Sequence, residues 1–129
     1  MIIVMSDNNR SNGFQHLIKA TGFSLSGLKA AWHNEIAFRQ EIILSVCILP
    51  LGFLLGENNA EKALLMASWI MVLVVELINS AIETLADRIS LEPHILSGRA
   101  KDLGSAAVFM SLVAAFLVWA LIIGSRFQQ

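Results

Sequence analysis

The sequence predicts an all-α membrane protein in which an N-terminal amphipathic surface helix precedes three transmembrane helices. Apolar side chains make up 56% of the 129 residues, more than an ordinary soluble domain of this size contains. They gather in three blocks, each long enough to cross the roughly 30 Å hydrocarbon core of a bilayer. Polar segments with turn-forming residues separate the blocks. The length suits a single domain over residues 1–129.

The first part of the chain carries charge but no long apolar run. The opening MIIV is too short for a signal peptide, and the basic region that begins such peptides is missing. Over about residues 10–35, apolar side chains such as Leu17, Leu25 and Trp32 recur at near-helical spacing among lysines and small polar residues. This pattern predicts one or two amphipathic helices on the membrane surface, with a soluble helical cap as the alternative.

The three apolar blocks predict transmembrane helices at about residues 36–56, 63–86 and 103–124. At the start of the first, Glu35 and Arg39 stand four residues apart and can pair on one helix face. Before the second, Asn58 followed three residues later by Glu61 resembles a capping box. A polar loop at 87–100, with Pro93 and Gly98 as helix breakers, precedes the third.

The basic residues divide unevenly between the two sides of the membrane. Only Lys62 and Arg126 fall on the side of the turn after the first span. The positive-inside rule therefore places the N-terminus and the 87–100 loop in the cytoplasm. Trp32 and Trp119 occupy positions typical of interfacial anchors. The basic residues on the predicted cytoplasmic side are Arg10, Lys19, Lys29, Arg39, Arg88, Arg99 and Lys101.

Composition and missing motifs argue against several classes of protein. The formal net charge of −1 gives no reason to expect a nucleic-acid partner. The single cysteine, Cys47, forms no internal disulfide and has no second thiol for a metal site. Neither G-x-x-x-x-G-K-[ST] nor G-x-G-x-x-G is present, so any nucleotide binds without these phosphate-binding loops.

The second predicted span carries a row of polar residues. Five of them fall within one stripe about 100° wide on a helical wheel, and the intervening apolar residues point elsewhere. Glu76 lies about 16 Å inside Asp87 along the helix axis, well within the hydrocarbon. An acidic residue at that depth costs about 2.5–3.5 kcal/mol on insertion scales, so it needs a partner or a task. The stripe consists of Glu76, Asn79, Ser80, Glu83 and Asp87.

Glu76 is the main candidate for catalysis, because a carboxylate in this setting can serve as a general base near neutral pH. Alternatively, it forms an interhelical hydrogen bond within an oligomer, or carries protons in a small proton-coupled transporter. The transporter is disfavoured, because the other half of the span, residues 63–75, offers only Ser68 and Trp69 as polar-capable groups.

A second group of charged residues gathers at the predicted cytoplasmic surface. Carboxylates from different helices can hold Mg²⁺ bridged to a polyphosphate, because Mg²⁺ takes one or two protein carboxylates and completes its shell with phosphates and water. An ordinary interfacial belt of charges is an equally good interpretation. The group comprises Glu35, Glu83, Asp87, His94, Arg99, Lys101 and Asp102.

Three stretches of the chain together resemble the prokaryotic diacylglycerol kinases. They are A-A-W-H-N-E-I-A-F-R-Q-E at 30–41, E-L-I-N-S-A-I-E-T-L-A-D-R-I at 76–89 and H-I-L-S-G-R-A-K-D-L-G-S-A-A-V at 94–108. The resemblance covers nearly the whole chain from Gly13 onward. It implies a homotrimer in the bacterial inner membrane, with active sites shared between neighbouring subunits. It also implies transfer of the γ-phosphoryl group of MgATP to the hydroxyl of diacylglycerol.

The resemblance implies roles for individual residues as well. Glu76 is expected to accept the proton of the lipid hydroxyl, with support from Asn79. Glu35 and Glu83 are expected to hold Mg²⁺ together with the nucleotide. Further nucleotide contacts are implied for His16, Phe23, Glu92, Pro93, His94, Lys101 and Asp102. Contacts to the lipid substrate are implied for Trp32, Arg39, Gln40, Glu76, Ser105 and Trp119.

The chain departs from the family pattern at three of these positions. His16 stands where the pattern favours Arg, and Phe23 where Tyr is common. Pro93 is unusual before His94. A neutral His16 contacts phosphate more weakly than Arg does. The lipid alcohol stays open between diacylglycerol and undecaprenol, because related proteins resemble undecaprenol kinases and acceptor choice depends on the shape of the groove.

Overall fold

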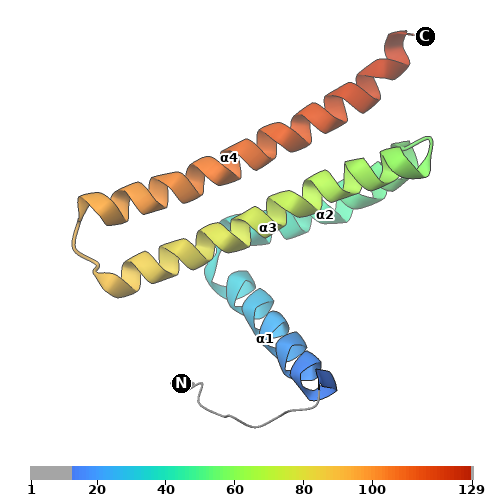
Figure 1. The fold of residues 1–129 in the computed structure, drawn as a ribbon. Coiled ribbons are helices and arrows are strands. Elements are labelled where there is room, and N and C mark those ends of the chain that lie inside the picture. The colour runs from blue at the N-terminus through green and yellow to red at the C-terminus, as the bar shows by residue number, and fades with distance from the viewer. Residues whose placement is uncertain (1–12, 129) are drawn as a thin grey trace.

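The computed structural model describes residues 13–128, which form four α-helices and a short 3₁₀ helix and contain no strand. The order is α1 (Gly13–Asn34), α2 (Ile36–Leu55), α3 (Asn59–Ile89), α4 (Ile95–Gly124) and η1 (Ser125–Gln128). α2, α3 and α4 run alongside one another with alternating direction, and α1 leaves them at an angle (Figure 1). The predicted all-α fold class is confirmed. The predicted start of the surface helix at about residue 10, with Arg10, lies outside the described residues.

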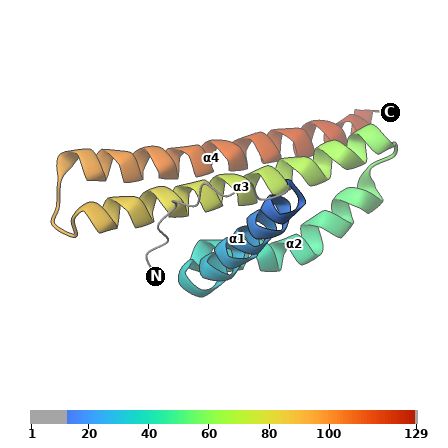
Figure 2. The same ribbon diagram turned by 60° about the horizontal axis from the view of Figure 1, so that its bottom comes forward.

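A single residue separates α1 from α2. Glu35 has extended backbone, with φ −111° and ψ 112°, and α1 therefore turns away from the bundle (Figure 1) and lies in front of it in Figure 2. The predicted pairing of Glu35 with Arg39 on one helix face is wrong, because Glu35 belongs to neither helix. Among residues 13–128, no ion pair joins these two side chains.

α3 is the centre of the bundle and packs against both α2 and α4. Leu65 and Val72 are its most deeply buried side chains. In α2, a Cβ atom on Gly52 would lie 3.2 Å from the Leu65 Cβ, so the missing side chain lets the two helices approach closely. The indole Nε1 of Trp69 donates to Ser45 Oγ at 2.7 Å and joins α3 to α2 within the apolar layer.

The α2–α3 turn is held by a helix cap and by ion pairs. Asn58 Oδ1 accepts the Glu61 N–H at 3.0 Å, which confirms the predicted N-cap of α3. The Glu61 carboxylate in turn accepts the Glu57 N–H at 2.8 Å. Arg126 of η1 lies 3.0 Å from Glu61 and 3.3 Å from Glu57, so the end of the chain is tied to this turn.

α2, α3 and the continuous segment of α4 and η1 are each long and apolar enough to cross a membrane. Large apolar side chains on their outer faces are exposed in the single chain, for example Leu54 at 75% and Met110 at 70%. Such faces suit contact with lipid tails or with other membrane helices, because both environments are as apolar as the side chains. The three predicted membrane helices are therefore present.

Candidate active site

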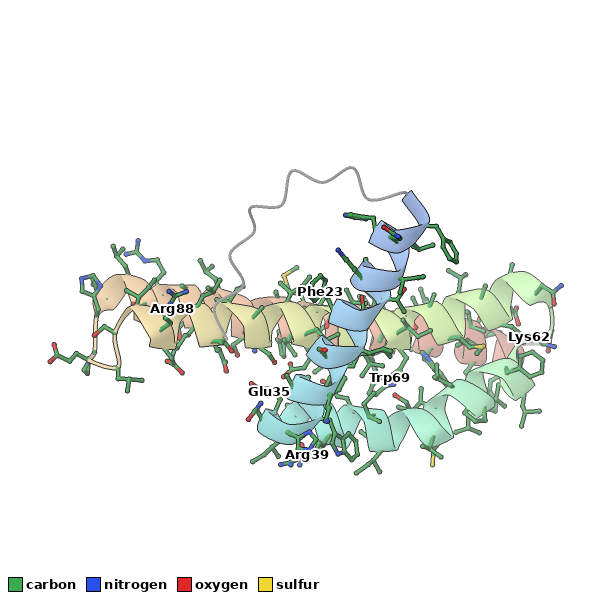
Figure 3. The ribbon with its side chains drawn as sticks, turned by 90° about the horizontal axis from the view of Figure 1, so that it is seen from below. Phe23, Glu35, Arg39, Lys62, Trp69 and Arg88 are labelled. Atoms are coloured by element: carbon green, nitrogen blue, oxygen red, sulfur yellow. The ribbon has the colours of Figure 1, made fainter. Side chains whose placement is uncertain are left out.

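A cavity of about 430 Å³ lies where the α1–α2 break meets the middle of α3 and the first half of α4. Three carboxyl groups line it, Glu35 from the break and Glu76 and Glu83 from α3. Figure 3 shows Glu35 at the foot of α1, beside the bundle. The other lining residues are Asn34, Ile36, Ala37, Asn79, Ser105 and Val108. We call this space the carboxylate cavity.

The wall that α3 contributes to the carboxylate cavity is buried and polar. Glu76 is 5% exposed and Asn79 is 9% exposed. Asn79 Nδ2 donates a long hydrogen bond of 3.4 Å to Glu83 Oε1, so the amide holds the neighbouring carboxylate. Asn79 Oδ1 has no hydrogen-bond partner in the part of the chain described. The amide thus keeps an acceptor free beside Glu76.

Gly104 brings α4 against this wall. A Cβ atom at this position would overlap the Asn79 Oδ1 and lie 3.3 Å from the Asn79 Cγ. Gly104 is also buried, so a methyl group added at this position could not move toward solvent to avoid the contact. The missing side chain is therefore what allows Asn79 to occupy its place between the two helices.

Within the part of the chain that the structure describes, the three carboxylates of the cavity lack cationic partners. Over residues 13–128, none of Glu35, Glu76 and Glu83 forms an ion pair with a Lys, Arg or His side chain. No group of three or more acidic, His or Cys side chains in this range is arranged to hold a metal ion by itself. A divalent cation at this site therefore needs further ligands, such as phosphate oxygens and water.

A second space adjoins the carboxylate cavity and shares Asn34 and Glu35 with it. This α1–α3 crevice has a volume of about 690 Å³ and lies between the second half of α1 and the middle of α3. Ser80 and Thr84 line it from α3. Its remaining lining residues are Ser24, Gly27, Leu28, Ala30, Ala31, Leu77 and Ala81. Asn34 and Glu35 thus lie at the border of two neighbouring spaces with different linings, and Glu76 lines the carboxylate cavity alone.

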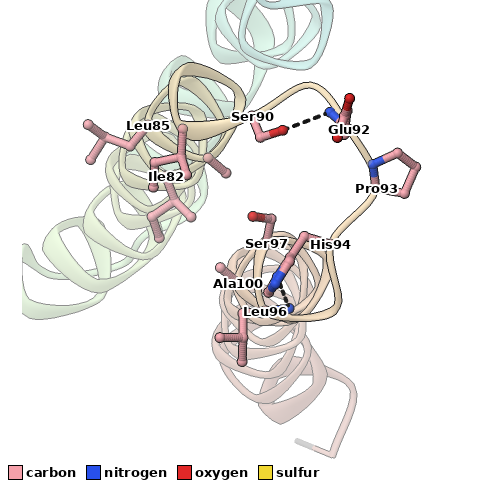
Figure 4. Close-up of a pocket in the computed structure, with 11 residues that line it drawn as sticks. Ile82, Leu85, Ser90, Glu92, Pro93, His94, Leu96, Ser97 and Ala100 are labelled. Atoms are coloured by element: carbon pink, nitrogen blue, oxygen red, sulfur yellow. Dashed lines mark hydrogen bonds between the residues drawn. The ribbon is translucent and has the colours of Figure 1, made fainter.

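The α3–α4 loop forms another cavity, of about 520 Å³, with mostly apolar walls (Figure 4). Glu92, Pro93 and His94, three of the residues predicted to contact nucleotide, line it together. His94 Nδ1 accepts the Leu96 N–H at 3.1 Å, so the imidazole also caps α4. The Glu92 N–H donates to Ser90 Oγ at 3.0 Å and fixes the start of the loop.

Lys101 connects the two helices near this loop. Its Nζ lies 2.5 Å from Asp87 Oδ1, and both side chains are about half exposed, at 42% and 49%. For the predicted nucleotide contact, Lys101 must therefore bind the nucleotide together with Asp87 or leave Asp87 to do so. The neighbouring Asp102 is exposed.

Several predicted site residues lie away from the carboxylate cavity. His16 and Phe23 are exposed on α1 (Figure 3 labels Phe23), and Trp32 and Gln40 are exposed on α1 and α2. Trp119 Nε1 donates to the Leu65 carbonyl at 3.1 Å. Leu65 precedes Glu76 by about 16 Å along α3. The single chain thus leaves these predicted contacts apart. It gathers Glu35, Glu76, Asn79, Glu83 and Ser105.

Sequence reasoning missed three residues of this region. Asn34 lines both spaces, and its position directly before Glu35 was the available signal. Gly104 positions Asn79, and no sequence pattern indicated that contact. Glu41 of α2 is 9% exposed, and its Oε2 has no hydrogen-bond partner in the described chain.

Comparison with known proteins identifies relatives over most of the chain. A family model described as prokaryotic diacylglycerol kinase matches residues 22–123. The diacylglycerol kinase of Haemophilus influenzae is 50% identical over 110 residues, which cover 85% of this chain and 93% of that protein. The diacylglycerol kinase of Pseudomonas aeruginosa is 48% identical over 111 residues, covering 86% and 90%. The diacylglycerol kinase of Escherichia coli strain K12 is 44% identical over 119 residues, covering 92% and 98%.

Proposed function

As a member of the prokaryotic diacylglycerol kinase family, the chain is a bacterial membrane kinase, and we propose that it phosphorylates diacylglycerol to phosphatidic acid. The phosphoryl donor in this proposal is MgATP, and the reaction takes place at the cytoplasmic face of the inner membrane. The observation that carries the proposal is the carboxylate cavity. There, a buried carboxyl group on an apolar helix shares one space with two further carboxylates.

Glu76 is the general base of the proposed reaction. It accepts the proton of the lipid hydroxyl while the hydroxyl oxygen attacks the γ-phosphorus of ATP. The bond from that phosphorus to the bridging oxygen breaks, and ADP leaves with the electron pair. Burial suits this role, because the Glu76 side chain is 5% exposed and is therefore largely shielded from bulk water. Asn79 supports the geometry through its bond to Glu83.

Glu35 and Glu83 hold Mg²⁺ in this proposal. Glu35 comes from the α1–α2 break and Glu83 from α3. Both carboxylates line the same cavity and lack ion pairs within residues 13–128, so they fit a cation that also binds phosphates. When bound, Mg²⁺ would neutralise charge on the phosphates of the nucleotide. Without such a cation, no Lys, Arg or His side chain of residues 13–128 pairs with these three acidic side chains.

The remaining nucleotide contacts are proposed at the predicted cytoplasmic end of the bundle. The cavity of the α3–α4 loop lies at this end and is lined by three of them. Lys101 offers a positive charge to the phosphates from its pair with Asp87. The proposed set is His16, Phe23, Glu92, Pro93, His94, Lys101 and Asp102.

The lipid is proposed to reach Glu76 from the α1–α3 crevice and from the membrane around it. Ser105 lines the carboxylate cavity and is placed to contact the glycerol part. Trp119 bonds to Leu65 on the α2–α3 turn side of Glu76, so its proposed contact is with acyl chains. The other proposed lipid contacts are Trp32, Arg39 and Gln40 near the α1–α2 break.

We also propose a homotrimer with shared active sites, with the N-terminus in the cytoplasm. A neighbouring subunit would bring together the nucleotide contacts that the single chain leaves apart, and would cover part of the apolar surface of α4. The distribution of basic residues supports the orientation. One domain over residues 1–129, with spans at about 36–56, 63–86 and 103–124, belongs to the same proposal.

The test is a phosphate-transfer assay in mixed micelles with γ-labelled ATP. The purified chain is given diacylglycerol or undecaprenol, with Mg²⁺ present or removed by a chelator. We expect Mg²⁺-dependent label in phosphatidic acid and little in the polyprenyl product. Label that goes mainly to the polyprenol would replace the proposed acceptor, and loss of label from ATP without label in either lipid would exclude lipid kinase activity.

A further inference from the structure

We propose that Ser80 determines the specificity for glycerides, because its hydroxyl donates a hydrogen bond to an ester carbonyl of the lipid in the α1–α3 crevice. The inference rests on the function proposed above and adds to it the chemical feature by which the substrate is selected. Ser80 has no part in the phosphoryl transfer just described. Three observations support a role for Ser80: its side chain is buried, its hydroxyl has no hydrogen-bond partner among the described residues, and it lies one helical turn from Glu76 along α3.

Ser80 differs from the other hydroxyl-bearing residues of the helices. Most of these satisfy their hydroxyl on a backbone carbonyl three or four residues earlier. Ser80 is 8% exposed, yet its Oγ bonds to no atom of residues 13–128. Buried hydroxyl groups are nearly always hydrogen-bonded, so this donor calls for a partner from outside the described residues. The residues with such backbone bonds are Thr21, Ser24, Ser45, Ser68, Thr84, Ser111 and Ser125.

The crevice that Ser80 lines fits an uncharged, largely apolar ligand. Leu28, Leu77 and alanines supply apolar walls, and Glu35 at the border is the one charged side chain among its lining residues in the described chain. Thr84 lies one turn further along α3, but its hydroxyl is already bound to the Ser80 carbonyl at 2.8 Å. Ser80 is therefore the donor on the α3 wall that a ligand can engage after rotation about χ1.

The spacing along α3 matches a glyceride. Ser80 follows Glu76 by one helical turn, about 6 Å along the axis. In diacylglycerol, the carbon that bears the free hydroxyl is bonded to the carbon that bears an ester, so alcohol and ester carbonyl lie about this far apart. Asn79 lies on the α4 side of α3 and Ser80 on the α1 side, with Glu76 between them. The alcohol can thus face Glu76 while the ester carbonyl faces Ser80.

A hydroxyl donor at this place selects for an ester. An ether-linked diglyceride has the same shape but lacks the carbonyl acceptor, and a polyprenol offers no acceptor besides its reacting hydroxyl. A site that hydrogen-bonds a polar group of its substrate discriminates against analogues without that group, because its own donor is then left unpaired.

The test compares a dioleoyl ester glyceride with the matched dioleyl ether glyceride in the micelle assay, using the full chain. For the wild type, we expect kcat/KM to be about tenfold higher for the ester than for the ether. In Ser80→Ala, the ester value should fall to that of the ether, and the ether value should stay unchanged. Ser80→Cys keeps the volume with a weaker donor and should lie between the two. Ser68→Ala, on the same helix, should behave like the wild type, because its hydroxyl is bound to the Leu65 carbonyl.

Thermal stability in the same detergent provides the second measurement. Removing an unpartnered buried hydroxyl should leave the melting temperature of Ser80→Ala equal to or above that of the wild type. Equal losses on ester and ether, or a wild type without ester preference, would overturn the role of Ser80. A lowered melting temperature would indicate that the hydroxyl binds a neighbouring subunit instead. A wild type that phosphorylates a polyprenol but neither glyceride would show that the proposed function itself has failed.

Discussion

At the α2–α3 turn, the carboxylates of Glu57 and Glu61 both pair with Arg126, whereas the three carboxylates of the cavity near the α1–α2 break have no cationic partner in the described chain. The α2–α3 turn resembles an ordinary structural surface, where charges are paired and the helix start is capped. The carboxylate cavity keeps acidic groups and unpartnered polar atoms inside an apolar bundle, which costs stability. Such a cost is typical of a functional site, so the difference separates the part that holds the fold from the part proposed to do chemistry.

Of the changes that test this difference, neutralising both proposed metal ligands should reduce the activity most. In Glu35→Gln/Glu83→Gln, kcat/KM for MgATP should fall by about 10³-fold or more, because charge stabilisation of the phosphates is lost. The measurement is a titration of activity against Mg²⁺ and ATP in mixed micelles. Glu57→Gln at the opposite end is the matched control and should keep its turnover. A double variant with wild-type Mg²⁺ dependence would contradict the metal assignment.

An intermediate effect is expected where α4 approaches the cavity. In Gly104→Ala, the new methyl group displaces Asn79, and we expect about a tenfold lower kcat with a stability loss of about 1–3 kcal/mol. Gly124→Ala is the control, because a Cβ atom there meets nothing within 4 Å. Kinetics and thermal unfolding of the two variants should be compared. If both behave alike, the close contact at Asn79 has no functional importance.

The smallest effect on turnover is expected at the α2–α3 turn. Arg126→Gln removes both ion pairs of this end, and stability should fall by about 1 kcal/mol, because partly exposed pairs contribute little. Turnover measured below the unfolding transition should remain within about twofold of the wild type. The ion pairs should weaken with added salt, so the stability difference should shrink at high ionic strength. A large loss of activity in the folded variant would contradict the claim that the α2–α3 turn serves stability alone.

Much of this architecture was predictable because membrane helices are specified by local sequence. Long apolar blocks predict the three membrane helices, and Asn58 predicts the cap that the structure contains. The polar stripe on the second span also predicted that Glu76, Asn79 and Glu83 would lie on one face, and all three line one cavity. These inferences need only helix geometry and the cost of burying charge in hydrocarbon.

What the sequence left undetermined depends on contacts between distant residues. The ion pair of Arg126 with Glu61 joins positions 65 residues apart, and the approach of Gly104 to Asn79 requires the packing of α4 on α3. The pairing of Glu35 with Arg39 was wrongly predicted, because periodicity does not show that a helix breaks at Glu35. Ser80 was part of the stripe, but only the position of α1 reveals that it lines a separate crevice.

The most direct test of the central claim is single-turnover transfer in Glu76→Gln beside the wild type, with MgATP and diacylglycerol bound beforehand. We predict that the variant keeps its melting temperature and binds both substrates with affinities close to those of the wild type. Transfer of the labelled phosphoryl group should be slower by about 10³-fold, because the base is missing. Transfer at the wild-type rate, with both substrates bound and the fold intact, would contradict the assignment of Glu76 as the base.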